Sequence, residues 1–107
     1  MQNDRLVGMI GLARRAGKTV IGTEQICLAL SKRRKDMVLV LISSSASSQT
    51  KKKITLKCEF YGVKATEISV DMDRLAKALG KTFATAAVAI TDCNFAEAIM
   101  SRIQEEE

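Results

Sequence analysis

The amino-acid sequence predicts an α/β protein: a single-domain three-layer α/β/α sandwich over residues 1–107, with a four-stranded mixed sheet. Three observations support this prediction. Helical and strand-like hydrophobic patterns alternate along the whole chain. No proline, internal repeat or long linker divides its 107 residues, a usual length for one domain. Strand–helix–strand units favour parallel neighbouring strands, but the first strand is short, so we expect a mixed sheet.

Glycines mark the limits of the first predicted elements. The first helix is expected to begin after Asn3, a good N-cap residue, and to end at Gly17, a typical residue after a helix. Residues 19–21 form a short β-prone segment, and the second helix is predicted over residues 23–34. The core-facing residues of this helix are Ile26, Ala29 and Leu30.

A continuous apolar run marks the second strand. Residues 37–42 are all apolar, which is typical of a strand covered on both faces. Residues 43–48 form a polar loop whose last serines can cap a third helix, and Gly62 ends that helix. The core-facing residues of the third helix are Ile54, Cys58 and Tyr61.

The remaining elements repeat the strand–helix pattern. Residues 63–68 are predicted as a strand, followed by a fourth helix that begins at Asp71 or its neighbour and stops at Gly80. Residues 86–90 form the last strand, and a final helix continues into an acidic tail. The core-facing residues of these two helices are Met72, Leu75, Ala76 and Leu79, and Phe95, Ile99 and Ile103.

Charge is unevenly distributed along the chain. Residues 1–64 contain 13 Lys and Arg against 4 Asp and Glu, whereas residues 65–107 contain 4 against 8. The net charges of the two parts are therefore +9 and −4. We expect one strongly basic pole, of the kind that binds a polyanion such as nucleic acid.

The thiols and the apolar segments indicate the compartment. Cys27, Cys58 and Cys93 are odd in number and widely spaced, and the chain has no His, so neither a zinc site nor a disulfide framework is expected. We expect buried free thiols in a reducing cytoplasm. No apolar run approaches the roughly 20 residues that span a bilayer, and the polar start gives no indication of a signal peptide.

Residues 17–19 imitate the end of a phosphate-binding loop. Five residues separate Gly11 from Gly17, where that loop requires four, and a predicted helix stands where the loop needs a strand. With no His, no paired carboxylates and no nucleophile–base spacing, we expect no catalytic residue, metal or cofactor, and therefore no enzyme. A phosphate-ligand enzyme using Lys18 and Thr19 is the least favoured alternative.

The start of the second helix is the strongest candidate for a binding site. Gly22 opens this helix, and the N–H groups of a helix start attract phosphate. Arg14, Arg15 and Lys18 precede it, although cations at a helix end also offset the dipole for purely structural reasons. Residues 51–53 are lysines near the start of the third helix, where the dipole disfavours cations, so a phosphate contact explains them better.

Several stretches together resemble one family. They are a helix followed by Ala16-Gly17-Lys18, a short strand and Gly22, then residues 47–54, residues 62–63, and Leu79-Gly80-Lys81 leading to residues 86–90. In this order they resemble the kink-turn RNA-binding ribosomal proteins, the archaeal "L seven Ae" protein and its relatives. The resemblance covers nearly the whole chain without insertion and is strongest to a bacterial branch of small ribosomal-protein-like members, the YlxQ type.

The resemblance implies a mode of RNA binding. In the family, the start of the second helix enters the widened major groove of a sharply bent RNA, and the loop before the last strand covers a flipped-out nucleotide. The family's Gly-x-Asn-Glu-x-x-Lys corresponds to residues 22–28, and the covering loop to residues 81–84. Glu24, Gln25 and Leu28 replace the family's Asn, Glu and Lys. Leu28 lies off the core-facing side of its helix, so we expect it to be partly exposed, as in a protein-binding surface.

We therefore expect a non-enzymatic protein that binds structured or ribosomal RNA, with the ribosome as a further candidate partner, monomeric when free and cytoplasmic. The candidate RNA-binding residues are Arg14, Arg15, Lys18, Gly22, Thr23, Glu24, Gln25, Lys51, Lys52, Lys53, Lys81, Thr82 and Phe83. The cations would hold phosphates, and Thr23, Glu24, Gln25 and Phe83 would meet bases. As alternatives, Glu24 is a dipole-compensating acid, Phe83 is a core residue, and the chain is a protein–protein interaction module of the same fold.

Overall fold

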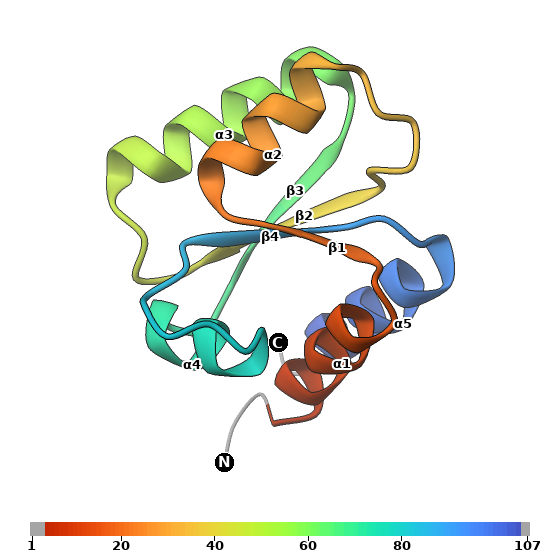
Figure 1. Cartoon of the computed structure of the whole chain (residues 1–107), viewed down its shortest axis with the longest axis vertical. Coiled ribbons are helices and arrows are strands. Elements are labelled where there is room, and N and C mark those ends of the chain that lie inside the picture. The colour runs from red at the N-terminus through yellow and green to blue at the C-terminus, as the bar shows by residue number, and fades with distance from the viewer. Residues whose placement is uncertain (1–3, 106–107) are drawn as a thin grey trace.

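The computed structural model describes residues 4–105 as helices packed on both faces of a four-stranded sheet (Figure 1). The elements in chain order are α1 (Asp4–Arg15), β1 (Thr19–Ile21), α2 (Thr23–Ser31), β2 (Leu39–Ser43), α3 (Ser48–Tyr61), β3 (Lys64–Ile68), α4 (Met72–Ala78), β4 (Ala87–Ile90) and α5 (Cys93–Glu105). The predicted α/β/α sandwich is confirmed. The N-cap predicted at Asn3 lies outside the described residues.

The sheet has the strand order β1-β4-β2-β3 and is mixed, as predicted. The strands β2 and β3 are parallel, whereas β4 runs antiparallel to both β1 and β2. The segments that follow β1, β2 and β3 therefore meet the segment before β4 at one end of the sheet, which we call the first end. Residues 17–18, 32–38, 62–63 and 91–92 lie at the opposite end, the second end.

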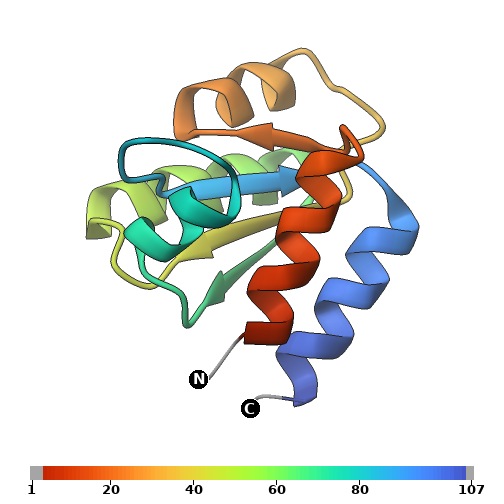
Figure 2. The same ribbon diagram turned by 60° about the horizontal axis from the view of Figure 1, so that its bottom comes forward.

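Two hydrophobic cores lie on the two faces of the sheet. Every residue of β2 is buried, and its side chains alternate between the faces. The helices α2 and α3 cover one face, and α1, α4 and α5 cover the other (Figures 1 and 2). The largest fully buried residues are aliphatic: Leu6, Ile10, Ile26, Leu30, Leu39, Leu41, Ile54, Leu75, Leu79, Ile90, Ile99 and Val40.

Local signals fixed most of the helix boundaries. The predicted cap by the last serines of the 43–48 loop is confirmed at Ser47, whose side chain accepts from the Thr50 N–H. The fourth helix starts where predicted, with Asp71 as its N-cap accepting from the Arg74 N–H. The predicted helix end at Gly62 is also confirmed, with φ of 72°. None of the helices over residues 4–105 has both the length and the apolar character that a bilayer crossing requires.

The end of α2 and the limits of β2 differ from the prediction. The helix α2 ends at Ser31 rather than at residue 34, because Arg33 adopts a left-handed conformation with φ of 55°. The N–H groups of Arg33 and Arg34 then donate to the carbonyls of the preceding turn, which closes the helix. The strand β2 begins two residues later than predicted and extends to Ser43.

The three cysteines occupy different environments. Cys27 and Cys58 are buried free thiols, as expected, but Cys93 is exposed at the start of α5, so the expectation was wrong for this residue. Burial, with a smaller contribution from Cys27, raises the pKa of the Cys58 thiol to about 11.

Candidate nucleic-acid interface

A cavity of about 590 Å³ opens at the first end, between the start of α2 and the loop that precedes β4. Pairing of β1 with β4 brings these two segments together, although they lie far apart in the sequence. The lining residues are Ile21, Gly22, Thr23, Glu24, Gln25, Met72, Lys81, Phe83, Ala84, Thr85 and Ala86. All four residues that the sequence predicted would contact bases therefore line this cavity.

The start of α2 presents its backbone to this cavity. Gly22 precedes the helix with φ of 98° and ψ of 145°, and no side chain caps the first turn. The Gly22 N–H donates to the Ala87 carbonyl at 3.1 Å, which ties the helix start to β4. The first N–H groups of the helix have no partner within the helix, so they are available to an anion or a base acceptor.

Gly22 is required by the backbone itself. Any residue with a side chain would be strained at a φ near 98°. The constraint is the backbone angle and not a lack of space, because a Cβ added here would meet no atom within 4 Å. We predicted from the sequence that glycine allows close approach of an RNA, and the structure adds a requirement that exists without any ligand.

The opposite wall is the loop before β4, which holds Phe83 outside the core. Phe83 is 74% exposed, so the alternative that it fills the core is wrong. Its carbonyl accepts a hydrogen bond from the Thr85 hydroxyl at 3.3 Å, and the N–H of the buried Thr85 donates to the Met72 carbonyl at 3.3 Å. The aromatic ring is therefore carried by a tethered loop and is open to solvent.

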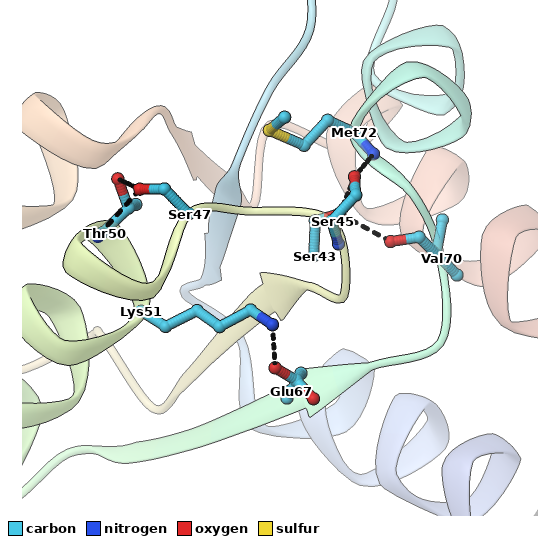
Figure 3. Close-up of polar contacts among 8 residues, drawn as sticks. All are labelled: Ser43, Ser45, Ser47, Thr50, Lys51, Glu67, Val70 and Met72. Atoms are coloured by element: carbon cyan, nitrogen blue, oxygen red, sulfur yellow. Dashed lines mark hydrogen bonds and ion pairs between the residues drawn. The ribbon is translucent and has the colours of Figure 1, made fainter.

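Hydrogen bonds of Ser43 and Ser45 join the segments that lead to the cavity walls, and two of them are drawn in Figure 3. The Ser43 hydroxyl donates to the Val70 carbonyl at 2.7 Å, and the Ser45 hydroxyl accepts from the Met72 N–H at 2.8 Å. The Ser43 N–H also donates to the Ala86 carbonyl at 2.8 Å. These bonds join the end of β2, the start of α4 and the loop before β4, so the walls of the cavity hold a defined geometry.

Several of the predicted cations lie at or near this cavity. Lys81 lines it. The Arg14 guanidinium lies beside Gly80, because a Cβ added at Gly80 would be 3.1 Å from its Nη2. Lys52 and Lys53 are exposed on the early turns of α3, which starts at the same end of the sheet. Lys51 forms an ion pair of 2.7 Å with Glu67 (Figure 3), so its charge is partly offset.

Seven of the thirteen candidate residues do not line the cavity; besides Arg14 and the lysines of residues 51–53, they are Arg15, Lys18 and Thr82. The Lys18 carbonyl accepts from the Thr91 N–H at 2.9 Å at the second end, across the sheet from Gly22, so the expectation that Lys18 joins this site was wrong. The Arg15 side chain folds back along α1, with Nε 3.4 Å from the Gly11 carbonyl. Thr82 is exposed in the loop, but it is not a lining residue.

The structure adds Met72 and Thr85 to the site. The helical pattern placed Met72 on the core-facing side of α4, where it is half-buried, but it also forms part of the cavity wall. No local signal identifies either residue, because their roles depend on contacts between α4 and a loop before the next strand. Over residues 4–105, no group of three His, Cys, Asp or Glu side chains is arranged to hold a metal ion.

Comparison with known families gives a match over nearly the whole chain. Residues 4–100 match the ribosomal protein L7Ae/L30e/S12e/Gadd45 family. The RNA-binding protein YlxQ of Bacillus subtilis (strain 168) is 37% identical over 93 residues, which cover 87% of this chain and 89% of that protein.

Solved structures share the fold. A protein of unknown function from Bacillus halodurans C has a TM-score of 0.81 and 28% identity, over 94% of this chain and 97% of that one. The 15.5kD RNA binding protein of Giardia lamblia has a TM-score of 0.75 and 15% identity, over 95% of this chain and 84% of that one. At 15% identity, this second likeness concerns the fold alone.

Proposed function

The chain belongs to the ribosomal protein L7Ae/L30e/S12e/Gadd45 family, and we propose that it is a non-enzymatic RNA-binding protein that grips structured RNA at the first end of its sheet. One observation carries this proposal: the uncapped start of α2 and the loop that bears the exposed Phe83 line a single cavity. The RNA-binding relative in Bacillus subtilis supports it.

The lining residues supply three kinds of contact. The N–H groups at the start of α2 donate to phosphate or to a base acceptor, and Gln25 both donates to and accepts from a base edge. Phe83 stacks on or covers an unstacked base. Lys81 attracts phosphate, and Glu24 accepts from a guanine amino group.

The proposed ligand is a bent RNA, such as a kink-turn in ribosomal RNA. The major groove of a regular RNA helix is too deep and narrow for a protein helix to read, whereas a sharp bend opens it. A cavity between a helix start and a loop also suits a base that projects from the stack. We propose ribosome association on the same basis, because ribosomal RNA supplies bent elements of this kind.

The test compares three RNAs in a fluorescence titration at two salt concentrations. They are a kink-turn, the same RNA with its G·A pairs replaced, and a plain duplex. We expect the kink-turn to bind most tightly. Equal affinities for the three RNAs would show that the protein is attracted to the RNA phosphates without recognising the bend. Failure to bind any of the three at low salt would overturn the proposal.

A matched pair of variants locates the contact. Gln25→Ala removes an amide from the cavity, and Gln104→Ala removes an exposed amide from α5 on the other side of the sheet. The first is expected to weaken kink-turn binding about fivefold to tenfold, the usual effect of losing one base-edge contact, and the second to leave it unchanged. Equal effects would place the contact elsewhere.

A protein–protein interaction module is the second candidate, favoured by Leu28. This side chain is 50% exposed on α2 and lines a small cavity of about 180 Å³ beside Gln25 and Lys32. If Leu28 contacts a protein, Leu28→Lys abolishes that association and leaves RNA affinity unchanged. If α2 faces RNA, the added cation strengthens RNA binding several-fold at low salt.

A further inference from the structure

A second cavity lies at the second end, where α2 and α3 terminate side by side (Figure 1). Its volume is about 540 Å³, similar to that of the cavity at the first end. Cationic residues from the segment after α2 form one wall, and two aromatic residues from the last turn of α3 form the other. The proposed function does not use this cavity.

The basic wall carries charge that few acids offset. Three of the four consecutive cations at residues 32–35 line this cavity: Arg33, Arg34 and Lys35. Arg34 is held by Asp36 through two hydrogen bonds of 2.6 and 3.0 Å. Within residues 4–105, no carboxylate forms an ion pair with Arg33 or Lys35. The wall therefore keeps two exposed cations that can bind an anion.

The aromatic wall carries a ring that is not packed in the core. Phe60 is 76% exposed at the end of α3. The Tyr61 ring supports it edge-on, at 4.9 Å between centroids and 84° between planes. The guanidinium carbon of Arg33 lies 5.7 Å from the Tyr61 centroid, which joins the basic and aromatic walls.

Arg33 is held in a conformation that suits glycine. It is the one non-glycine residue with positive φ in the described part of the chain, and it closes α2 at the mouth of this cavity. Strained residues of this kind occur at functional sites more often than elsewhere. The sequence thus places a long cationic side chain at a position where the backbone conformation favours glycine.

We propose that the second cavity binds an unpaired nucleotide of the same RNA, with its base stacked on Phe60 and its phosphate held between Arg33 and Lys35. The proposal rests on the proposed function for the source of the ligand. Exposed aromatics beside a basic groove are the usual means of binding single-stranded nucleic acid. An uncompensated basic wall favours this polyanion over a neutral or cationic protein surface.

The spacing of the cavities suits one continuous RNA. The α2 helix, nine residues long, separates them by about 13 Å. Lys57 lies between them on α3, where its ammonium group donates to the Ser31 hydroxyl at 3.1 Å. An RNA that leaves the first cavity across α2 and α3 therefore meets further positive charge before it reaches Phe60.

The experiment adds a single-stranded tail to a kink-turn RNA. Affinity is measured for the kink-turn alone, for the kink-turn with about eight unpaired uridines at either end, and for the free uridine oligomer. The test variants are Phe60→Leu and the double variant Arg33→Gly/Lys35→Ala, in which glycine suits the left-handed backbone. The charge control is Arg5→Ala/Arg102→Ala, on the α1 and α5 side of the sheet.

For the wild-type protein, we expect one of the two tails to raise affinity about tenfold, the usual effect of one stacked base. Both test variants should lose this gain and still bind the tailless kink-turn normally, and the control should keep it. If neither tail adds affinity, or if the control loses the gain as well, the second site is overturned and the proposed function stands.

Two further outcomes separate the proposals. If the protein ignores the kink-turn but binds the uridine oligomer through Phe60, the second site stands and the proposed function falls. If sedimentation shows a dimer that Phe60→Leu dissociates, the surface belongs to a second copy of the chain and the proposal is overturned.

Discussion

In the proposed RNA contact, Phe83 is the residue on which recognition of a base depends most directly. Because its ring is 74% exposed, replacing it removes little packing. Phe83→Ala is expected to lower kink-turn affinity about tenfold, since stacking of a base on an aromatic ring contributes roughly 1–3 kcal/mol. The unfolding midpoint in urea should hardly change. The measurement is a titration with the tailless kink-turn RNA, beside an unfolding curve.

Phe60 offers the matched control for this prediction. It is equally exposed, at 76%, but it lies at the second end of the sheet. Phe60→Ala should bind the tailless RNA as the wild type does. If both substitutions weaken binding equally, the loss reflects a general surface effect and Phe83 has no specific role.

Cys58 makes stability depend on alkaline pH. Its pKa is raised to about 11 by burial, with a smaller contribution from Cys27, above the ordinary value of 9.0. Above pH 9 the unfolded chain loses the thiol proton before the folded chain does, so the free energy of unfolding falls between pH 9 and about 11.

Substitution of Cys58 isolates this contribution. In urea unfolding at pH 8.5 and 11, Cys58→Ala should reduce the alkaline loss by roughly 2 kcal/mol relative to the wild type. Cys93→Ala, which removes the exposed thiol, should leave the loss unchanged. Identical pH slopes in the wild type and in Cys58→Ala would show that the buried thiol does not contribute.

Two glycines test how backbone conformation governs the helices. Gly8 lies within α1 and Gly62 ends α3, and a Cβ added at either would meet no atom within 4 Å. They differ in that Gly62 has φ of 72°. Gly8→Ala should raise the free energy of unfolding by about 0.5–1 kcal/mol, and Gly62→Ala should lower it by about 1 kcal/mol.

Urea unfolding of the two variants measures both signs in one experiment. Neither substitution creates a clash. Opposite changes in the free energy of unfolding would therefore come from the difference in φ and from the lower conformational entropy of alanine in the unfolded chain. A loss of stability in Gly8→Ala would indicate that α1 depends on a close approach that the structure does not contain.

The helix starts differ in whether a side chain caps their first N–H groups. Side chains of Ser47 and Asp71 close the starts of α3 and α4, and Asp92 accepts from two N–H groups at the start of α5. The start of α2 has only Gly22 before it and no side-chain cap. An open helix start at the wall of a cavity is an element-level feature that is suited to an anionic ligand.

Across the whole molecule, the positive charge lies at both ends of the sheet. Residues 51–53 and Lys81 lie at the first end, whereas Lys18 and residues 32–35 lie at the second. The expectation of one basic pole was therefore wrong, because basic residues lie at both ends of the sheet.

Salt dependence measures the contribution of this charge. If the tailless kink-turn contacts about four cations, log Kd should rise with log salt concentration with a slope of about 3. Lys52→Ala/Lys53→Ala should reduce that slope by about 1.5, because two fewer cations release counterions on binding. Phe83→Ala should weaken binding at every salt concentration without changing the slope. A wild-type slope near zero would contradict an electrostatic contact.

The sequence by itself determined the elements and their order. Hydrophobic period, caps such as Ser47 and Asp71, and stops such as Gly62 act within a few residues, so the local pattern is sufficient to predict them. Where a helix end depends on strain instead of on a typical residue, as at Arg33, the pattern gave a boundary three residues too late. The exposed Leu28 was predicted correctly, because it lies off the buried side of α2.

Only the tertiary structure decided which predicted residues share a site. Lys18 and Gly22 are near neighbours in sequence, but an extended strand carries them to opposite ends of the sheet. Antiparallel pairing of β1 with β4 brings Gly22 to Ala87 and thereby to the loop that holds Phe83. Such contacts depend on strand order and on packing between distant segments. The same long-range packing decided that Phe83 and Phe60 are exposed at two different cavities.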